Sequence, residues 1–268
     1  SSLSDTIASR TLYRWAEQLD IGPRATNIYA DLNERLIHGI LNHIEAIRAA
    51  LESGNLTYEQ LVYADQTPIW ICTGHKSATG SGIVFGDGGD AKGGKKVGNL
   101  WAVITPQGCR RAWVTDMNGD EETAKQFFLS ETCPEGWTNL YGEDGNIFDV
   151  LAAYGRRLSG NPFTRWKIIL CVDRLGKSGA SDYPVAGHHA PEMRVRAHKA
   201  GVGLLMLPAK GALVNPIELW NFHVKRVTDA AQPSDSPRDN WGQLVRGPRS
   251  KEEAYDMVRD AIVSLNED

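Results

Sequence analysis

Three acidic residues occupy positions from which carboxylates could act together. Asp65 and Asp173 each end an apolar run that is predicted to form a strand, and Glu218 lies in the first turn of a predicted helix. Carboxylates that are brought together repel one another and raise one another's pKa, and a divalent cation removes that cost. Ligand sets made only of oxygen suit Mg²⁺ or Mn²⁺. The pattern therefore raises the hypothesis of a metal site.

Each of these residues also has a purely structural interpretation. A Glu in the first turn of a helix is stabilised by the helix dipole, and an Asp after a strand commonly begins a turn. The context of Glu218 is informative: a strand over 202–207 is closed by Pro208, Asn215 stands in the N-cap position, and Pro216 is the first helical residue. Three apolar residues of that helix recur at helical spacing and are predicted to face the core: Ile217, Trp220 and Val224.

Two short blocks resemble a known family. Asn215-Pro216-Ile217-Glu218 resembles the third catalytic block of mariner-like DDE transposases, in which the Glu is a metal ligand. Asp65-Gln66-Thr67 is similar to the Asp-Glu-Ser or Asp-Glu-Thr of the first block, with Gln in place of Glu. Arg174 follows Asp173 where many relatives have Asn, and the stretch between the last two acidic residues is longer than the mariner pattern. The chain thus resembles a divergent member of that superfamily.

The resemblance implies an α/β fold, namely a ribonuclease H-like mixed sheet flanked by helices, with an N-terminal helical segment. Residues 1–55 are expected to be helical, a remnant of a helix-turn-helix DNA-binding region plus a linker helix. Residues 56–268 are expected to form the DDE catalytic domain. In such a fold the first and fourth strands lie side by side, so that Asp65 and Asp173 meet and Glu218 arrives from a neighbouring helix. The alternative for the first 19 residues is an amphipathic surface helix.

The same resemblance implies a function: a DNA transposase that cleaves transposon ends and transfers the freed strand into target DNA. Asp65, Asp173 and Glu218 would hold two Mg²⁺ or Mn²⁺ ions roughly 3.5–4 Å apart. The expected partners are DNA (transposon ends and target) and a second copy of the chain in a homodimer, with no membrane. The expected location is nuclear in a eukaryote and otherwise cytoplasmic, at the nucleoid. Two alternatives stay open: a domesticated, transposase-derived DNA-binding protein without transposition activity, and a ribonuclease H-like nuclease.

Other residues carry weaker signals. His188, His189 and Cys171 are the alternative metal ligands, although adjacent His side chains point apart on a regular element. Six basic residues could contact phosphates or could simply be solvated surface charges: Lys92, Lys95, Lys96, Lys177, Lys225 and Arg226.

Composition sets wide limits. A chain of 268 residues suits one large domain or a domain with an appendage, and 41% hydrophobic with 23% charged residues is ordinary for a globular protein. The net charge of −4 weighs against a general nucleic-acid binder without excluding one, because basic residues can gather locally. No apolar run approaches the roughly 20 residues needed to span a bilayer, and no signal-peptide pattern opens the chain. The four Cys residues show no Cys-x-x-Cys spacing.

The elements that must position the acidic residues follow from periodicity and turn signals. Helices are predicted over 27–51, 120–129, 147–158, 191–200 and 250–265. Strands are predicted over 60–65, 99–105, 109–115, 166–173 and 202–207, the second and third joined by a turn at 106–108. Segments 74–98 and 130–145 are predicted to be loops.

Overall fold

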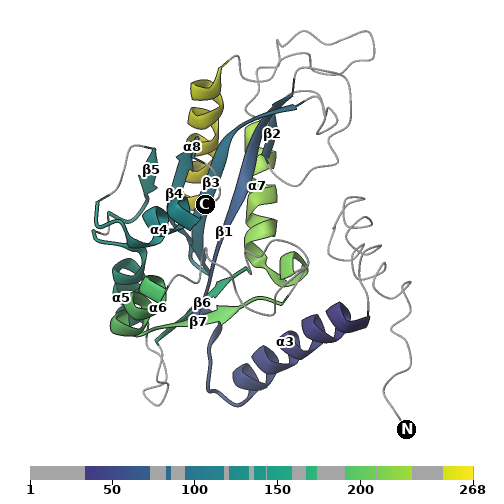
Figure 1. Cartoon of the computed structure of the whole chain (residues 1–268), viewed down its shortest axis with the longest axis vertical. Helices are drawn as coiled ribbons and strands as arrows, with labels where there is room; N and C mark the ends of the chain where they lie inside the picture. Colours follow the sequence, from purple (N-terminus) through teal and green to yellow (C-terminus); the bar gives the residue numbers. More distant parts are fainter. Residues whose placement is uncertain are drawn as a thin grey trace.

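The computed structural model describes residues 34–72, 83–85, 94–117, 121–132, 136–142, 144–158, 167–173, 191–208, 211–230 and 250–267. Its elements follow one another along the chain as shown in Figure 1. The helices are α3 (Glu34–Glu52), α4 (Glu121–Leu129), α5 (Ile147–Arg157), α6 (Pro191–Ala200), α7 (Pro216–Ala230) and α8 (Lys251–Glu267), with 3-10 turns η1 (Tyr58–Gln60) and η2 (Gly211–Val214). The strands are β1 (Leu61–Cys72), β2 (Ile83–Phe85), β3 (Gly94–Thr105), β4 (Gly108–Thr115), β5 (Trp137–Asn139), β6 (Ile168–Val172) and β7 (Val202–Met206).

The strands form one mixed sheet in the order β5-β4-β3-β1-β6-β7, and β2 pairs with β1. Strands β1, β3, β4 and β5 pair antiparallel, whereas β6 lies parallel to both β1 and β7. The first long strand therefore lies beside the strand that precedes Asp173, as expected. This order, with helices on both faces, is the ribonuclease H-like α/β fold, and the predicted fold class is confirmed.

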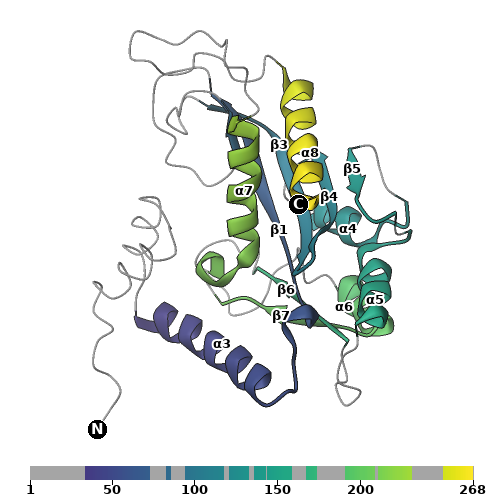
Figure 2. The ribbon, with the colours of Figure 1, turned by 180° about the vertical axis from the view of Figure 1, so that it is seen from behind.

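The two faces of the sheet are covered by different helices. On one face, α4, α5 and α6 pack on a cluster that includes Val62, Ala64 and Trp101. On the other face, α7 and α8 pack on a cluster that includes Ile69 and Ala102, and Figure 2 shows these two helices side by side over the sheet. Successive side chains of a strand point to opposite faces of the sheet. Alternate residues of β1 and β3 therefore belong to the two different clusters. A strand buried on both faces reads as a continuous apolar run.

A smaller apolar cluster lies where α3 and η2 meet the sheet. Leu61, Cys171 and Leu207 are buried there, and Ile47 of α3 packs against them. Tyr63 borders both this cluster and the one under α7 and α8. The α7 face is therefore covered by two apolar clusters rather than one, which matters for the position of Asp65.

Most predicted elements are confirmed within a few residues. Helices α4, α5, α6 and α8 match their predicted ranges, and Ala124, Phe127 and Phe128 of α4 are fully buried. The β3–β4 hairpin and its turn are also confirmed. The backbone N–H of Glu253 donates to the Ser250 hydroxyl oxygen at 3.1 Å, which caps the start of α8. Residues 1–33, which hold the predicted N-terminal helix and the start of the helix over 27–51, lie outside the described residues.

Three predictions on strands are wrong. Asp65 does not end its strand, because β1 continues to Cys72 through antiparallel pairing with β3. The predicted loop over 74–98 contains β2 and the first five residues of β3, and the predicted loop over 130–145 contains β5. In each case the strand is created by a partner strand distant in sequence, and local propensity is a weak guide to such pairing.

None of the described helices is long and apolar enough to cross a bilayer.

Gly98 is a point where the sheet and α8 approach too closely for a side chain. A Cβ atom at this position would lie 2.5 Å from the Thr115 carbonyl oxygen and would overlap the Tyr255 hydroxyl group. That hydroxyl donates a hydrogen bond of 2.6 Å to the Val97 carbonyl oxygen. We expect Gly98→Ala to lower the free energy of unfolding by about 2–3 kcal/mol, the usual cost of overpacking.

Urea unfolding of the purified variants measures this effect. Gly39→Ala is the matched control, since its nearest neighbour would be the Pro208 Cβ atom at 3.9 Å and Ala favours a helix interior over Gly. We expect Gly39→Ala to keep or increase stability. Equal midpoints for the two variants would show that α8 does not press on Gly98.

Candidate active site

Asp65 and Asp173 are brought together by strand register. The parallel pairing of β1 with β6 ends at Ala64 and Val172, and the residue that follows each of these two is an Asp. Asp173 follows β6 directly, whereas Asp65 lies inside β1 and pairs with Ala102 on its antiparallel side. Adjacent positions on neighbouring parallel strands face the same side of the sheet.

Next to Asp65, one edge of β1 has no partner strand among the described residues. In the described part of the chain, β6 pairs with Leu61–Ala64 and β2 pairs with Ile69–Ile71, so that residues 65–68 lie between two parallel partners. Pro68, which has no N–H to donate, is tolerated in such a gap. The gap places Asp65 in a notch of the sheet, between the two apolar clusters of the α7 face.

Glu218 is positioned by the start of α7. The Asn215 side-chain oxygen accepts from the Ile217 N–H at 3.4 Å, and the Asn215 carbonyl oxygen accepts from the Glu218 N–H at 3.0 Å. Pro216 is the first helical residue, as predicted, and its missing N–H has no partner to lose. Ile217 and Val224 are buried and Trp220 packs beside them, so the predicted core face of α7 is confirmed. Glu218 thereby stands at the positive end of the helix dipole.

Two hydrogen bonds hold the carboxyl group of Asp65. Its Oδ1 atom accepts from the backbone N–H of Gln66 at 2.7 Å. Its Oδ2 atom accepts from the side-chain amide of Asn215 at 2.9 Å, across 150 positions of sequence. Each oxygen keeps a further lone pair.

The electrostatics show that the three carboxyl groups influence one another. Burial raises the pKa of Asp65 to about 8, and the charges of Glu218 and Asp173 act in the same direction, against the hydrogen bonds from Gln66 and Asn215. Much of the Glu218 side chain is accessible to solvent, yet partial desolvation and then the charge of Asp173 raise its pKa as well. The structure thus brings the three predicted residues within range of one another's charge.

The donor set fits a hard divalent cation: it contains only oxygen, it is partly buried, and its mutual repulsion is what a cation would relieve. The positions of the three carboxyl groups fit a metal ion less well than their chemical type does. Among the described residues, no group of three or more His, Cys, Asp or Glu side chains is already arranged to hold a metal ion. A bound ion would have to draw the carboxyl groups of Asp65, Asp173 and Glu218 closer together.

The other candidates fall in different places. Cys171 is fully buried, and burial raises the pKa of its thiol to about 12, so it is protonated at neutral pH. Lys96 on β3 and Arg226 on α7 are exposed, and Lys225 is half-buried. Lys95 lies on β3, with its side chain outside the description. Four predicted residues lie outside the described residues altogether: Lys92, Lys177, His188 and His189.

Two residues at the site carry roles that the sequence did not indicate. Asn215 was predicted only as a cap, and its bond to Asp65 depends on a strand far away in sequence. Gly211 lets η2 pass close to the cluster, because a Cβ atom there would lie 2.8 Å from the Leu207 Cβ atom and 3.8 Å from Oδ1 of Asp173. A lone Gly in a loop has many explanations, so no sequence signal could have singled it out.

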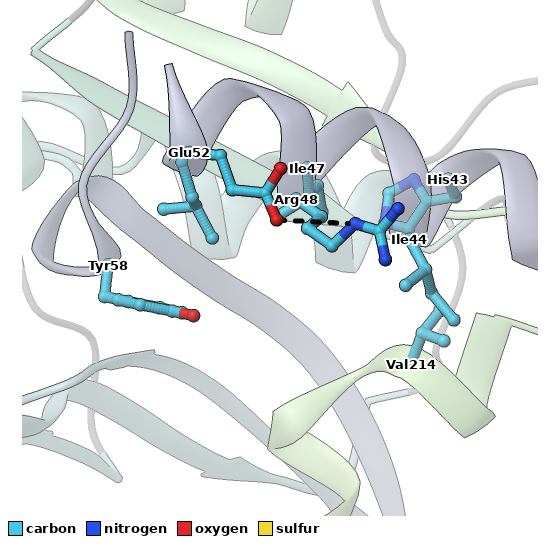
Figure 3. Close-up of a pocket in the computed structure, with 8 residues that line it drawn as sticks. His43, Ile44, Ile47, Arg48, Glu52, Tyr58 and Val214 are labelled. Carbon is cyan, nitrogen blue, oxygen red and sulfur yellow. Dashed lines mark ion pairs between the residues drawn. The ribbon is translucent and has the colours of Figure 1, made fainter. Parts of the chain in front are cut away.

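A separate groove of about 520 Å³ lies between α3, η1 and η2, and none of the three acidic residues lines it (Figure 3). Arg48 and Glu52, which form an ion pair of 3.7 Å, lie on the wall of the groove, and Tyr58 also lines the groove. The remaining lining residues are mostly apolar: His43, Ile44, Ile47, Leu51 and Val214. The groove brings no second cluster of carboxylates, and we assign it no chemistry.

Comparisons with known proteins give matches only among solved structures. No protein-family model matches this chain, and no curated protein matches it. Among solved structures, it is similar to the catalytic domain of Mos1 mariner transposase, at 13% identity with a TM-score of 0.44, covering 88% of this chain and 95% of that one.

Two further structures of the same transposase resemble the chain. One is that catalytic domain with raltegravir and Mn, at 13% identity with a TM-score of 0.42, covering 88% of this chain and 94% of that one. The other is a paired-end complex with the left transposon end, at 16% identity with a TM-score of 0.43, covering 98% of this chain and 72% of that one. At these identities and TM-scores, the assignment of the fold rests on the strand order given above.

Strand order and site together define the class of this protein: a ribonuclease H-like α/β domain with an acidic cluster at the β1–β6 junction. Within that class, the solved structures that it resembles are those of a mariner transposase.

Proposed function

We propose that this chain is the catalytic part of a DNA transposase, which cleaves transposon ends and joins them to target DNA with the help of divalent metal ions. The observation that carries the proposal is the meeting of Asp65, Asp173 and Glu218. They come from β1, from the end of β6 and from the first turn of α7, and each lies within range of the others' charge. The motif resemblance around Asp65 and Glu218 supports the same reading.

Asp65, Asp173 and Glu218 would hold two Mg²⁺ or Mn²⁺ ions, which supply activation of an attacking oxygen and stabilisation of the leaving oxygen during in-line displacement at phosphorus. The chain itself sets the geometry. Hydrogen bonds from Gln66 and Asn215 orient Asp65. The dipole of α7 favours an ionised Glu218.

The proposed partners follow from the reaction. The DNA backbone is polyanionic, and Arg226 and Lys225 lie on the same helix as Glu218, where they could contact phosphates. Pairing of two transposon ends would require a second copy of the chain, which we propose as a homodimer. Such an enzyme would act where the DNA is, in a nucleus or a nucleoid.

The alternative functions make different demands on the same cluster. A domesticated DNA-binding protein has no use for three carboxyl groups that repel one another, so their retention favours catalysis. A simple nuclease of the same fold would use the cluster but would not depend on end sequences.

The test uses a supercoiled plasmid that carries the sequences flanking this gene in its own genome. We expect Mn²⁺ to produce cuts at the flanking sequences and EDTA to prevent them. A plasmid without those sequences is the control: equal cutting of both plasmids would indicate a nuclease. If a folded protein cuts neither plasmid, the proposed transposase activity is refuted and the alternative of a domesticated DNA-binding protein is favoured.

Metal binding can be measured on the same protein without DNA. At about 100 times the Kd, a ligand that binds only the folded state stabilises it by about 2.7 kcal/mol. We therefore expect Mn²⁺ to raise the midpoint of thermal unfolding. An unchanged midpoint at saturating Mn²⁺ would contradict the metal site.

A further inference from the structure

We propose that Asn215 is a positioning residue for the acidic cluster, which its side-chain amide joins to the helix that carries Glu218. The inference rests on the proposed function of that cluster and goes beyond the capping role that the sequence predicts. One amide group bonds at the same time to β1, through Asp65, and to the start of α7, through Ile217.

The orientation of the amide follows from its two partners. A backbone N–H can only donate, so the atom that faces Ile217 must be the oxygen. The amino group then faces Oδ2 of Asp65 at 2.9 Å. Asn215 is only 4% exposed, so water does not compete strongly for either bond. The orientation is therefore fixed by hydrogen bonding rather than by choice of rotamer alone.

Two consequences follow for the cluster. The donated hydrogen bond fixes the direction in which Oδ2 of Asp65 points and leaves a further lone pair of that oxygen for a cation. The same bond restrains the distance between β1 and the first turn of α7, and so between Asp65 and Glu218. Partners of metal-binding carboxylates that act in this way commonly affect metal affinity 10- to 100-fold.

Other capping residues could not replace Asn215 in both roles. Ser and Asp cap helices about as well as Asn. Ser is shorter by the amide group and would not be expected to span the gap to Asp65. Asp has no N–H to donate and would place a fourth negative charge beside Asp65, Asp173 and Glu218. Asn215→Ser therefore preserves the cap while removing the bond to the cluster, without the added charge of Asn215→Asp, which would itself attract a cation.

The chain offers a matched control at another helix. Asn146 caps α5, its side-chain oxygen accepting from the N–H groups of Phe148 at 3.0 Å and Asp149 at 3.2 Å. Its amino group bonds to Glu131 and Asp149, away from the acidic cluster. Asn146→Ser thus reports the cost of replacing a buried capping amide, together with its two bonds to carboxylates outside the acidic cluster.

The experiment measures Mn²⁺ affinity by calorimetry and stability by thermal unfolding on the full chain. We expect Asn215→Ser and Asn146→Ser to lower the unfolding midpoint comparably. Asn146→Ser should leave Mn²⁺ binding unchanged, whereas Asn215→Ser should weaken it by roughly 10- to 100-fold. Wild-type Mn²⁺ affinity in a folded Asn215→Ser variant would overturn the proposal and leave Asn215 as a cap.

A second measurement separates this inference from the proposed function. In metal-free buffer, the side-chain amide protons of Asn215 should exchange slowly in the wild type and faster in Asp65→Ala, as NMR can detect. If the wild type does not bind Mn²⁺, the proposed function is refuted. If the amide protons exchange equally fast in both proteins, the link between Asn215 and Asp65 is refuted.

Discussion

Replacing Asp173 with Asn should strongly reduce metal-dependent DNA cleavage and leave the fold intact. Asn has the same size and could serve as well in a turn, so a structural role would survive the change. A ligand role would not, because the ions organise the whole transition state. We expect the cleavage rate to fall by roughly 10²- to 10³-fold, a loss typical of removing one electrostatic contact to the transition state. Cleavage assays and thermal unfolding on the same preparation measure the two effects.

The variant has two internal controls. Metal-free stability should stay the same or rise slightly, because one source of like-charge repulsion on Asp65 and Glu218 disappears. DNA binding without metal should hardly change, because phosphate contacts come from basic residues elsewhere. Normal cleavage by folded Asp173→Asn would falsify the catalytic assignment and, with it, the proposed transposase mechanism.

The stability of the metal-free protein should fall as the pH rises from about 4 to about 8, and Asp65→Asn should remove much of that fall. The folded state raises the pKa of Asp65 to about 8, whereas the unfolded chain releases the same proton near pH 4. Between these values the folded state binds more protons than the unfolded state, so the free energy of unfolding decreases with pH. Below pH 4 both states are protonated, and above pH 8 the loss is complete.

The size of the effect is several kcal/mol over the full range, since one unit of pKa corresponds to about 1.4 kcal/mol and other carboxyl groups contribute. Urea unfolding at a series of pH values, with EDTA present, measures the slope for both proteins. Saturating Mn²⁺ should reverse the trend in the wild type, because the ion competes with protons for the carboxylates. Parallel slopes for wild type and Asp65→Asn would disprove the raised pKa.

Asp116 provides a control of opposite sign. It is exposed, and its hydrogen bond and ion pair with Lys251, at 2.6 Å, lower the pKa of its carboxyl group. Its contribution to stability is present above its unfolded pKa and is lost as the pH falls. Asp116→Asn should therefore reduce stability slightly near neutral pH and leave the slope between pH 4 and 8 close to that of the wild type.

The local features of the site could be read from the sequence. The apolar run before Asp173 forms β6, and the Asn215-Pro216 pair starts α7 with Glu218 in its first turn. These features depend on residues within a few positions of one another: strand propensity, a capping side chain, and the fixed φ of Pro. The helices α4 to α8 were predictable for the same reason, since their apolar residues recur at the helical period.

What joins these features was decided by the tertiary structure. Asp65 looked like the end of a strand because the apolar run stops there and Pro68, three positions later, has no N–H to donate to a ladder, yet β3 pairs with β1 as far as Cys72. The short strand β2 consists of three residues that favour strands, Ile83-Val84-Phe85, but a run of three is too short to predict a strand without its pairing with β1. Such strands depend on partners far along the chain, which local propensity does not encode.

The sequence by itself determined which residues are the candidates for the proposed chemistry and which elements hold Asp173 and Glu218. The tertiary structure alone decided that β1 and β6 stop pairing one residue before Asp65 and Asp173. It also decided that Asn215 reaches Asp65 from 150 positions away. The physical reason is that a capping bond is made within one turn of chain, whereas strand register and burial are set by packing of the whole sheet.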